Sequence, residues 1–355
     1  MDETASPIKS ICGRINPLDQ SWIEAARERQ LTLTKPPTSL GRLEEVANQL
    51  AAIQQTTTPR VAKKRIYVVA GDHGVTAEGV SAYPREVTAQ MVDNFLRGGA
   101  AINVLARHGE IEVKVVDASV DADLSGHKGL IDLKNVRGTA NFARGPAMTN
   151  EEAERLILSG MELVQSAWAE GINLLGIGDM GIGNTTAASA ITAALTGKDP
   201  AILTDRGTGV DDARLTRKIE VVRQALAVNQ PDRFDAIDIL AKVGGAEIAV
   251  MMGIVIGAAA TRIPVVADGF ISTAAAALAV TLCPNARGYL FVAHRSVEQG
   301  HTLLVDFVGI QPLLDLKMRL GEGTGAALAM HIIDASAKLL SEMATFAEAA
   351  VSDKK

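Results

Sequence analysis

The stretch INLLGIGDMGIGNTT, residues 172–186, combines an apolar run with a glycine-rich turn, and an Ala-rich helical pattern follows it. The apolar run is continuous rather than alternating, which is typical of a parallel strand buried on both faces. Glycines between a strand and a helix indicate a tight turn at the carboxyl end of the strand. The stretch therefore predicts one strand–helix unit of a parallel α/β sheet.

The same pattern recurs along the chain. Short apolar runs end in polar or glycine-rich turns at 65–70, 112–119, 172–178, 201–205, 262–268 and 288–294. Helical patterns lie between most of them, at 84–109, 150–171 and 211–229. This alternation predicts an α/β fold with a doubly wound, mostly parallel, Rossmann-like sheet of about six strands and right-handed crossovers.

The two ends of the chain show no such strands. Residues 17–55 have the pattern of two helices around an extended KPPTSLG segment, and residues 312–350 have a helical pattern alone. We therefore expect an α/β domain over residues 60–311 and a smaller helical domain built from residues 1–59 and 312–355.

The composition excludes several classes of protein. The 355-residue chain has 47% hydrophobic residues, a net charge of -6 and no long basic run, which argues against nucleic-acid binding. The most apolar stretch, 248–260, is too short to span a bilayer and predicts a buried core helix. Cys12 and Cys283 form no pair motif, and the first residues lack a signal-peptide pattern, so we expect a cytoplasmic protein.

Polar residues follow the apolar runs, at the edge of the sheet where open α/β proteins bind ligands. They include Asp72, His73, Asp179 to Thr186, Arg206 to Asp212, Asp268, and His294 to Ser296. His73, His294 and His301 make a metal site conceivable, but no HxH, HExxH or CxxC spacing is present. We expect orienting or structural roles for these histidines and no metal.

The glycine loop allows two interpretations. Gly176, Gly178 and Gly181 match G-x-G-x-x-G, and Asp205 could bind a ribose, which leaves a nicotinamide-dependent oxidoreductase open. The segment GIGNTT, 181–186, instead opens a helix with backbone N–H groups suited to a phosphate monoester. Capping by Asn184 or Thr185 would not need Gly181 and Gly183, so phosphate binding is favoured. No Gly-Lys-Ser/Thr follows, which excludes a P-loop.

Two further segments carry candidate residues. RGTGVDD, 206–212, supplies Arg206 in a glycine turn, and Lys218 lies one to two turns into the next helix, where it could reach a phosphate or be solvated. In LGEGTGAALA, 320–329, Glu322 lies between glycines and precedes an apolar run. Packing beside apolar surface raises the pKa of a carboxylate, so Glu322 is a candidate general base.

Long motifs in this order are similar to those of one family. They are LTKPPTSLGRLEEVA (33–47), AGDHGVTAEGVSAYPREVTAQM (70–91), GDMGIGNTTAA (178–188), RGTGVDD (206–212), KVGGAEIA (242–249), DGFISTAAA (268–276), AHRSVEQGH (293–301) and LGEGTGAALA (320–329). Together they resemble the nicotinate-nucleotide–dimethylbenzimidazole phosphoribosyltransferases, the CobT family, over nearly the whole chain. Two positions depart from the family pattern: Thr38 stands where glycine is common, and Asp179 where glutamate is common.

The resemblance implies transfer of the phosphoribosyl group of nicotinate mononucleotide to 5,6-dimethylbenzimidazole or a related base. The products would be nicotinate and α-ribazole 5′-phosphate, for the lower ligand of cobalamin. The resemblance also implies a homodimer without a metal or redox cofactor, in which Glu322 is the general base and the glycine loop and Lys218 hold the phosphate. The substrate-binding residues would be Asp179, Gly181, Ile182, Gly183, Asn184, Thr185, Arg206, Gly207, Lys218, Gly321 and Gly323, with Ser81, Tyr83 and Gln90 beside the acceptor.

Two other functions remain as alternatives at this point. One is the oxidoreductase that would use Gly176, Gly178, Gly181 and Asp205. The other is a nucleotide-binding protein without catalytic activity.

Overall fold

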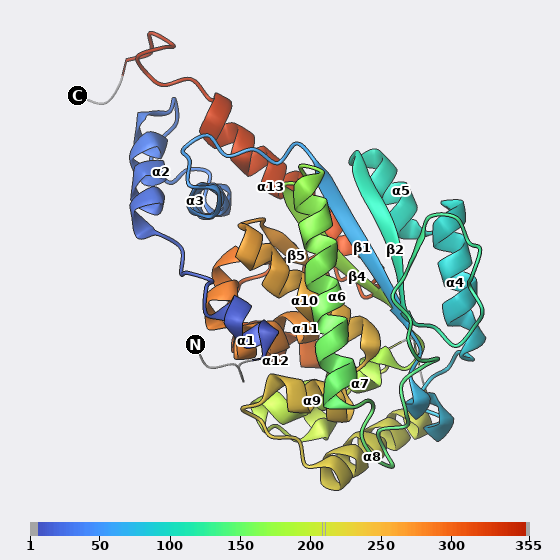
Figure 1. Cartoon of the computed structure of the whole chain (residues 1–355). Helices are drawn as coiled ribbons and strands as arrows, with labels where there is room; N and C mark the ends of the chain where they lie inside the picture. Colours follow the sequence, from blue (N-terminus) through green and yellow to red (C-terminus); the bar gives the residue numbers. More distant parts are fainter. Residues whose placement is uncertain (1–5, 208, 210, 353–355) are drawn as a thin grey trace.

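The computed structural model describes residues 6–207, 209 and 211–352 (Figure 1). Within these residues six strands form one sheet in the order β3-β2-β1-β4-β5-β6, and every neighbouring pair is parallel. The strands are β1 (Lys64–Gly71), β2 (Ile111–Ser119), β3 (Leu130–Asp132), β4 (Leu174–Met180), β5 (Val265–Ala267) and β6 (Leu290–Val292). The predicted parallel α/β fold is confirmed.

One predicted strand is wrong and one strand was missed. Residues 201–205 are not a strand, because Pro200–Ile202 forms a 3-10 turn (η2) whose first free N–H, that of Ala201, is capped by the Asp199 side chain. The remaining strand of the sheet is β3, which is three residues long and incompletely buried at the sheet edge. So short an edge strand leaves no continuous apolar run in the sequence.

Helices precede, connect and follow the strands. Before β4 they are α1 (Pro7–Cys12), α2 (Gln20–Thr32), α3 (Arg42–Gln54), the 3-10 helix η1 (Gly74–Glu78), α4 (Glu86–Arg97), α5 (Ala101–His108) and α6 (Asn150–Ala169). After β4 they are α7 (Asn184–Thr196), α8 (Asp212–Asn229), α9 (Ala236–Val243), α10 (Ala246–Thr261), α11 (Phe270–Leu282), η3 (Pro284–Tyr289), α12 (Gln299–Val308) and α13 (Thr324–Glu342). The helical pattern at 84–109 comprises two helices, because Gly98 ends α4 with a φ of +79°.

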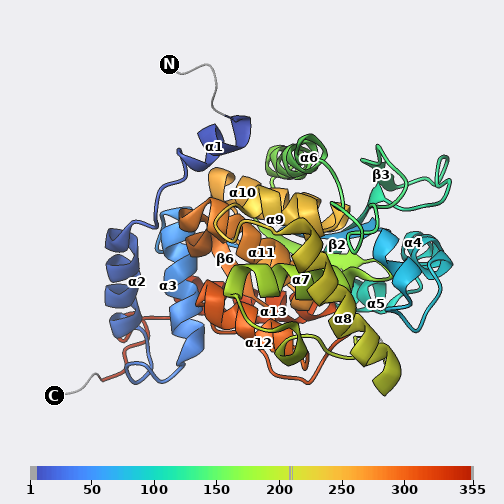
Figure 2. The same cartoon turned by 90° about the horizontal axis from the view of Figure 1, so that it is seen from below.

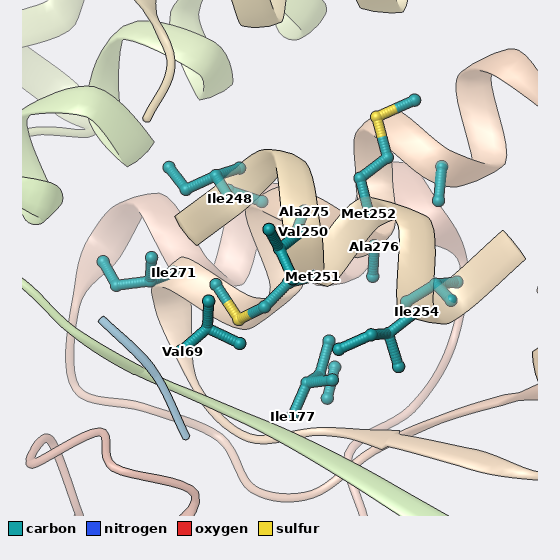
Figure 3. Close-up of a cluster of buried hydrophobic side chains, with 14 of the residues drawn as sticks. Val69, Ile177, Ile248, Val250, Met251, Met252, Ile254, Ile271, Ala275 and Ala276 are labelled. Carbon is teal, nitrogen blue, oxygen red and sulfur yellow. The ribbon is translucent and has the colours of Figure 1, made fainter. Parts of the chain in front are cut away.

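The helices cover both faces of the sheet. On one face, α10 and α11 pack against alternate strand residues such as Val69 and Ile177, as Figure 3 shows. On the other face, α13 lies so close to β4 that a Cβ on Gly176 would come within 2.8 Å of Met330. Figure 2 shows α10 and α13 on opposite sides of the sheet. The predicted core helix at 248–260 is α10, and it is buried from Ala246 to Ala259.

The two chain ends meet beside the sheet. The Arg29 guanidinium donates to the Leu340 carbonyl at 2.7 Å, and Leu33 pairs with Thr345 in an antiparallel bridge. Ala26, Ala47, Ala51 and Leu340 form a small apolar cluster of their own. Helix α13 thus reaches from the sheet to α2 and α3 (Figure 1).

No helix in the described part of the chain is both long enough and apolar enough to span a membrane.

Two glycines allow α6 and α10 to touch through their backbones. A Cβ on Gly253 would overlap the Ile157 carbonyl oxygen, and a Cβ on Gly160 would overlap the Val250 carbonyl oxygen. The neighbouring atoms belong to helix backbone, so they cannot move aside as a flexible side chain can. Close contact between the two helices therefore depends on the absence of side chains at these positions.

We expect Gly253→Ala to lower the free energy of unfolding by about 1–3 kcal/mol, because it overpacks this contact. Urea denaturation followed by circular dichroism measures the change. Gly145→Ala is the matched control, since a Cβ there meets no atom within 4 Å. Equal stability of the two variants would contradict the argument.

Candidate active site

A cavity of about 360 Å³ lies at the carboxyl edge of the sheet. Its walls come from α4, from the turns after β4, β5 and β6, and from the loop before α13. A larger hollow of about 1120 Å³ runs along α2, α3 and the 284–290 segment. The smaller cavity is the candidate active site, because buried carboxylates, the start of a helix and an apolar wall converge there.

Asp268 holds the start of α13 against the sheet. This buried carboxylate follows β5 and accepts hydrogen bonds from Gly323 N at 2.9 Å and from Ala326 N at 3.0 Å. Burial raises the pKa of Asp268, while His294 and the helix N–H groups act to lower it. The interaction satisfies otherwise unpaired N–H groups of the first helical turn. It also fixes the position of Glu322, which immediately precedes Gly323 in the chain.

Glu322 lies in this loop with only 6% of its surface exposed, and it lines the cavity. Its φ is +64°, and the flanking Gly321 and Gly323 also have positive φ values. Such a turn brings the loop down onto β4, where a Cβ on Gly178 would overlap the Gly323 nitrogen. Burial raises the pKa of Glu322, and the Asp268 carboxylate adds to the rise, while the Ile102 N–H opposes it.

The glycine loop after β4 is held from three sides. The Thr88 hydroxyl on α4 accepts a hydrogen bond from Ile182 N at 3.1 Å. The Asn184 amide donates to the Asp179 carboxylate at 2.9 Å. Below the loop, Gly183 adopts a φ of +97° where a Cβ would come within 2.9 Å of Thr76. The Ile182 N–H is therefore already used, and the loop presents the start of α7 to the cavity.

Asp179 is the most strongly perturbed acid of the site. Burial raises its pKa well above the ordinary value, and the Asp268 and Glu247 carboxylates add to the rise. Its backbone carbonyl also accepts a hydrogen bond from Glu322 N at 3.2 Å. Asp179 therefore joins the glycine loop to the Glu322 loop.

Lys218 lies behind the cavity wall and is buried. Its ammonium donates to the Thr185 hydroxyl at 2.9 Å and to the Asp205 carbonyl at 3.0 Å. Burial lowers its pKa to about 8, against the opposing effects of Glu298 and Asp205. Arg319 contributes a second cation here and donates to the Gly207 carbonyl at 2.7 Å. We call this part of the cavity, around Thr185, Gly207, Lys218, Glu298 and Arg319, the cationic corner.

Another part of the cavity wall is largely apolar. Tyr83, Val87 and Met91, four residues apart on and before α4, line it together with Ile182 and Leu320. The predicted residues Ser81 and Gln90 are not among the lining residues. The Ser81 hydroxyl accepts a hydrogen bond from Tyr83 N, and Gln90 is exposed on α4. This wall suits a flat aromatic ligand.

The structure brings many of the predicted residues to one cavity. Those that line it are Tyr83, Asp179, Gly181, Ile182, Asn184, Thr185, Gly207, Gly321 and Glu322. Gly183 and Gly323 shape the two loops from behind, and Lys218 contacts Thr185. Arg206 lies at an exposed turn, where it pairs with Asp212. Thr208 and Val210 of the predicted RGTGVDD turn lie outside the described residues.

Other lining residues escaped the sequence analysis. They are Val87, Met91, Glu298, Arg319, Leu320 and the 269–271 segment. The spacing of four residues between Tyr83, Val87 and Met91 indicates one helix face, so it was a usable signal. Thr88, which holds the loop from outside the cavity, gives no comparable signal.

The structure removes the basis of the oxidoreductase hypothesis. A Cβ on Gly176 would contact Ile66 and Met330, and one on Gly178 would overlap the Glu322 loop. These glycines therefore serve the packing of α13 and its preceding loop. They do not shape a turn around a pyrophosphate, as the dinucleotide fingerprint requires.

The histidines have other partners. The His73 ring nitrogen Nε2 lies 2.7 Å from a Glu247 carboxylate oxygen, and both side chains are fully buried. His301 contacts Thr273 and accepts a hydrogen bond from Ser296 N. Over the described ranges, no group of three or more His, Cys, Asp or Glu side chains is placed to hold a metal ion.

Comparisons with known proteins agree in one family. The sequence model of the family described as "Phosphoribosyltransferase" matches residues 15–351. Nicotinate-nucleotide–dimethylbenzimidazole phosphoribosyltransferase of Geobacter metallireducens is 56% identical over 337 residues, which cover 95% of this chain and 96% of that protein. The enzyme of the same name from Chloroflexus aggregans is 55% identical over 341 residues, 96% of this chain and 97% of that protein.

A solved structure agrees as well. The crystal structure of CobT from Thermus thermophilus superposes with a TM-score of 0.91 at 50% identity, covering 94% of this chain and 100% of that one. Sequence and fold thus match along nearly the full length of both chains. The chain belongs to the nicotinate-nucleotide–dimethylbenzimidazole phosphoribosyltransferase family.

Proposed function

We propose that this protein transfers the phosphoribosyl group of nicotinate mononucleotide to 5,6-dimethylbenzimidazole or a related base. The products are nicotinate and α-ribazole 5′-phosphate, the precursor of the lower ligand of cobalamin. The family membership supports this reaction, and one observation in the cavity carries the mechanism. Glu322 is a buried carboxylate on the wall of a cavity that also has a cationic corner and an apolar side.

The reaction needs one base. The leaving group is a pyridinium on C1′, so it departs as a neutral ring and needs no proton. The lone-pair nitrogen of the benzimidazole attacks C1′ from the opposite face, which converts the β linkage to α. The second nitrogen must then lose its proton. A single carboxylate with a raised pKa, Glu322, suits this step.

Two parts of the cavity wall suit the two substrates. The phosphate would bind at the cationic corner and at the start of α7, where Asn184, Thr185 and Gly207 line the wall. The acceptor would lie against Tyr83, Val87 and Met91, within reach of Glu322. Asp179 would face the ribose between them. Holding both substrates in one geometry supplies much of the rate acceleration.

We also propose a homodimer in the cytoplasm, and a helical domain of residues 1–59 and 312–355 beside the α/β domain of residues 60–311. The unpaired Cys12 and Cys283 are compatible with a reducing compartment. The small Ala26–Ala47–Ala51–Leu340 cluster supports the helical domain. The family resemblance supports the dimer.

Glu322→Gln should keep nucleotide binding but lose most turnover, about 100-fold or more, because the amide cannot accept the acceptor's proton. The wild-type rate should rise with pH through the pKa of Glu322, and the variant should lack this rise. Chromatographic measurement of α-ribazole phosphate tests both. Near-normal product formation by the variant would rule out Glu322 as the base.

Lys218→Met should weaken nicotinate mononucleotide binding by about 10- to 100-fold, the effect of losing a charged hydrogen bond. In the wild type, kcat/KM for the nucleotide should fall as pH rises through about 8, where free Lys218 loses its proton. Steady-state kinetics measure both effects. Lys198→Met, at an exposed lysine, is the control, and equal KM values for the two variants would refute the assignment.

A further inference from the structure

Glu298 is a buried carboxylate at the cationic corner that the proposed chemistry leaves without a role. It follows β6, directly precedes α12 and lines the cavity with 6% of its surface exposed. The backbone N–H of Gly207 acts to lower the pKa of this carboxylate. Its second oxygen, Oε2, has no hydrogen-bond partner among the described residues. A buried and unsatisfied carboxylate oxygen is costly, so it calls for an explanation.

A capping role does not account for this side chain. Glu298 stands at the N-cap position of α12, but its side chain makes no capping hydrogen bond there. The N-terminal helix dipole favours a negative charge at this position, yet an exposed glutamate would serve equally well. The burial of Glu298 and its position in the cavity wall remain unexplained by the helix.

The charges around Glu298 nearly balance before any substrate binds. Lys218 and Arg319 favour its ionised form, and Asp205 opposes it. Burial is the largest effect and raises the pKa of Glu298 above its ordinary value. His301, also on α12, has its pKa lowered to about 3 by burial and by His294 and Arg295, so it stays neutral near pH 7. At the cationic corner, the two cations Lys218 and Arg319 thus lie near two carboxylates, Glu298 and Asp205.

A phosphate dianion would add two negative charges to this balanced set. A buried carboxylate beside a dianion is unfavourable unless a proton lies between them, because both groups can only accept hydrogen bonds when ionised. The second pKa of a phosphate monoester is about 6, so one proton can be shared between the two groups.

We propose that Glu298 and the phosphate of nicotinate mononucleotide share one proton, taken from solvent when the nucleotide binds. The inference rests on the proposed function. The O–H between the two groups gives the Glu298 carboxylate a hydrogen-bond partner and turns a repulsive contact into a charge-assisted hydrogen bond. Glu298 is then a binding residue of the phosphate, and it favours a phosphate monoester over an anion that cannot share a proton.

Isothermal titration calorimetry of the full-length protein tests the proposal. Nicotinate mononucleotide is titrated without acceptor at pH 7, in phosphate-free buffers of different ionisation enthalpy. The slope of heat against buffer enthalpy gives the protons taken up. Lys218, with a pKa of about 8, is mostly protonated at pH 7 and contributes little.

We expect uptake of about one proton in the wild type, and an affinity that falls about tenfold per pH unit just above pH 7. Glu298→Gln should reduce the uptake to near zero and flatten this pH dependence, since the amide can donate to the dianion. Glu220→Gln removes an exposed carboxylate from the same helix as Lys218 and should behave as the wild type. Circular dichroism checks that each variant is folded.

Binding without proton uptake, or equal uptake by the wild type and Glu298→Gln, would overturn the proposal. A turnover assay separates this failure from that of the proposed function. If the wild type forms α-ribazole phosphate but takes up no proton on binding the nucleotide, only the role of Glu298 is wrong. If it neither binds nicotinate mononucleotide nor forms product, both the function and this inference fail.

Discussion

The hydrogen bonds from the start of α13 to the Asp268 carboxylate are the interaction on which the site depends. They tie the last helix to the end of β5 and leave room for no side chain at Gly325, where a Cβ would overlap the His294 ring. Burying a carboxylate is expensive, and several N–H donors with the helix dipole offset that cost. Because Glu322 directly precedes these donors, its place is set by the packing of α13.

The sequence predicted the structure best where a pattern of neighbouring residues alone decides the local fold. Continuous apolar runs identified β1, β2 and β4, and the glycines after β4 identified the loop that lines the cavity. It failed at 201–205, where Pro200 and the Asp199 cap override an apolar run. The burial of Lys218 and the contact between Thr88 and Ile182 depend on how helices distant in the sequence pack, so no local pattern predicts them.

Carboxylates dominate one part of the cavity, whereas its two cations lie beside Glu298 in another part. Asp179, Asp268 and Glu322 gather near the ends of β4 and β5. Burial raises the pKa of all three, and the Asp268 carboxylate adds to the rise for Asp179 and Glu322. Lys218 and Arg319 stand at the cationic corner. In the proposed reaction, this arrangement would orient a substrate that carries a phosphate at one end and a ring cation at the other.

The apolar wall differs from the rest of the cavity in how it is built. The loops around Asp179 and Glu322 are tied by backbone hydrogen bonds and glycine contacts, so a substitution there disturbs the sheet. Val87 and Met91 instead lie on α4, and Tyr83, which precedes that helix, is about half exposed. Their side chains can change size without moving a strand. At the acceptor position proposed above, evolution can therefore change the fit to the ring through these three side chains without disturbing the loops that hold Asp179 and Glu322.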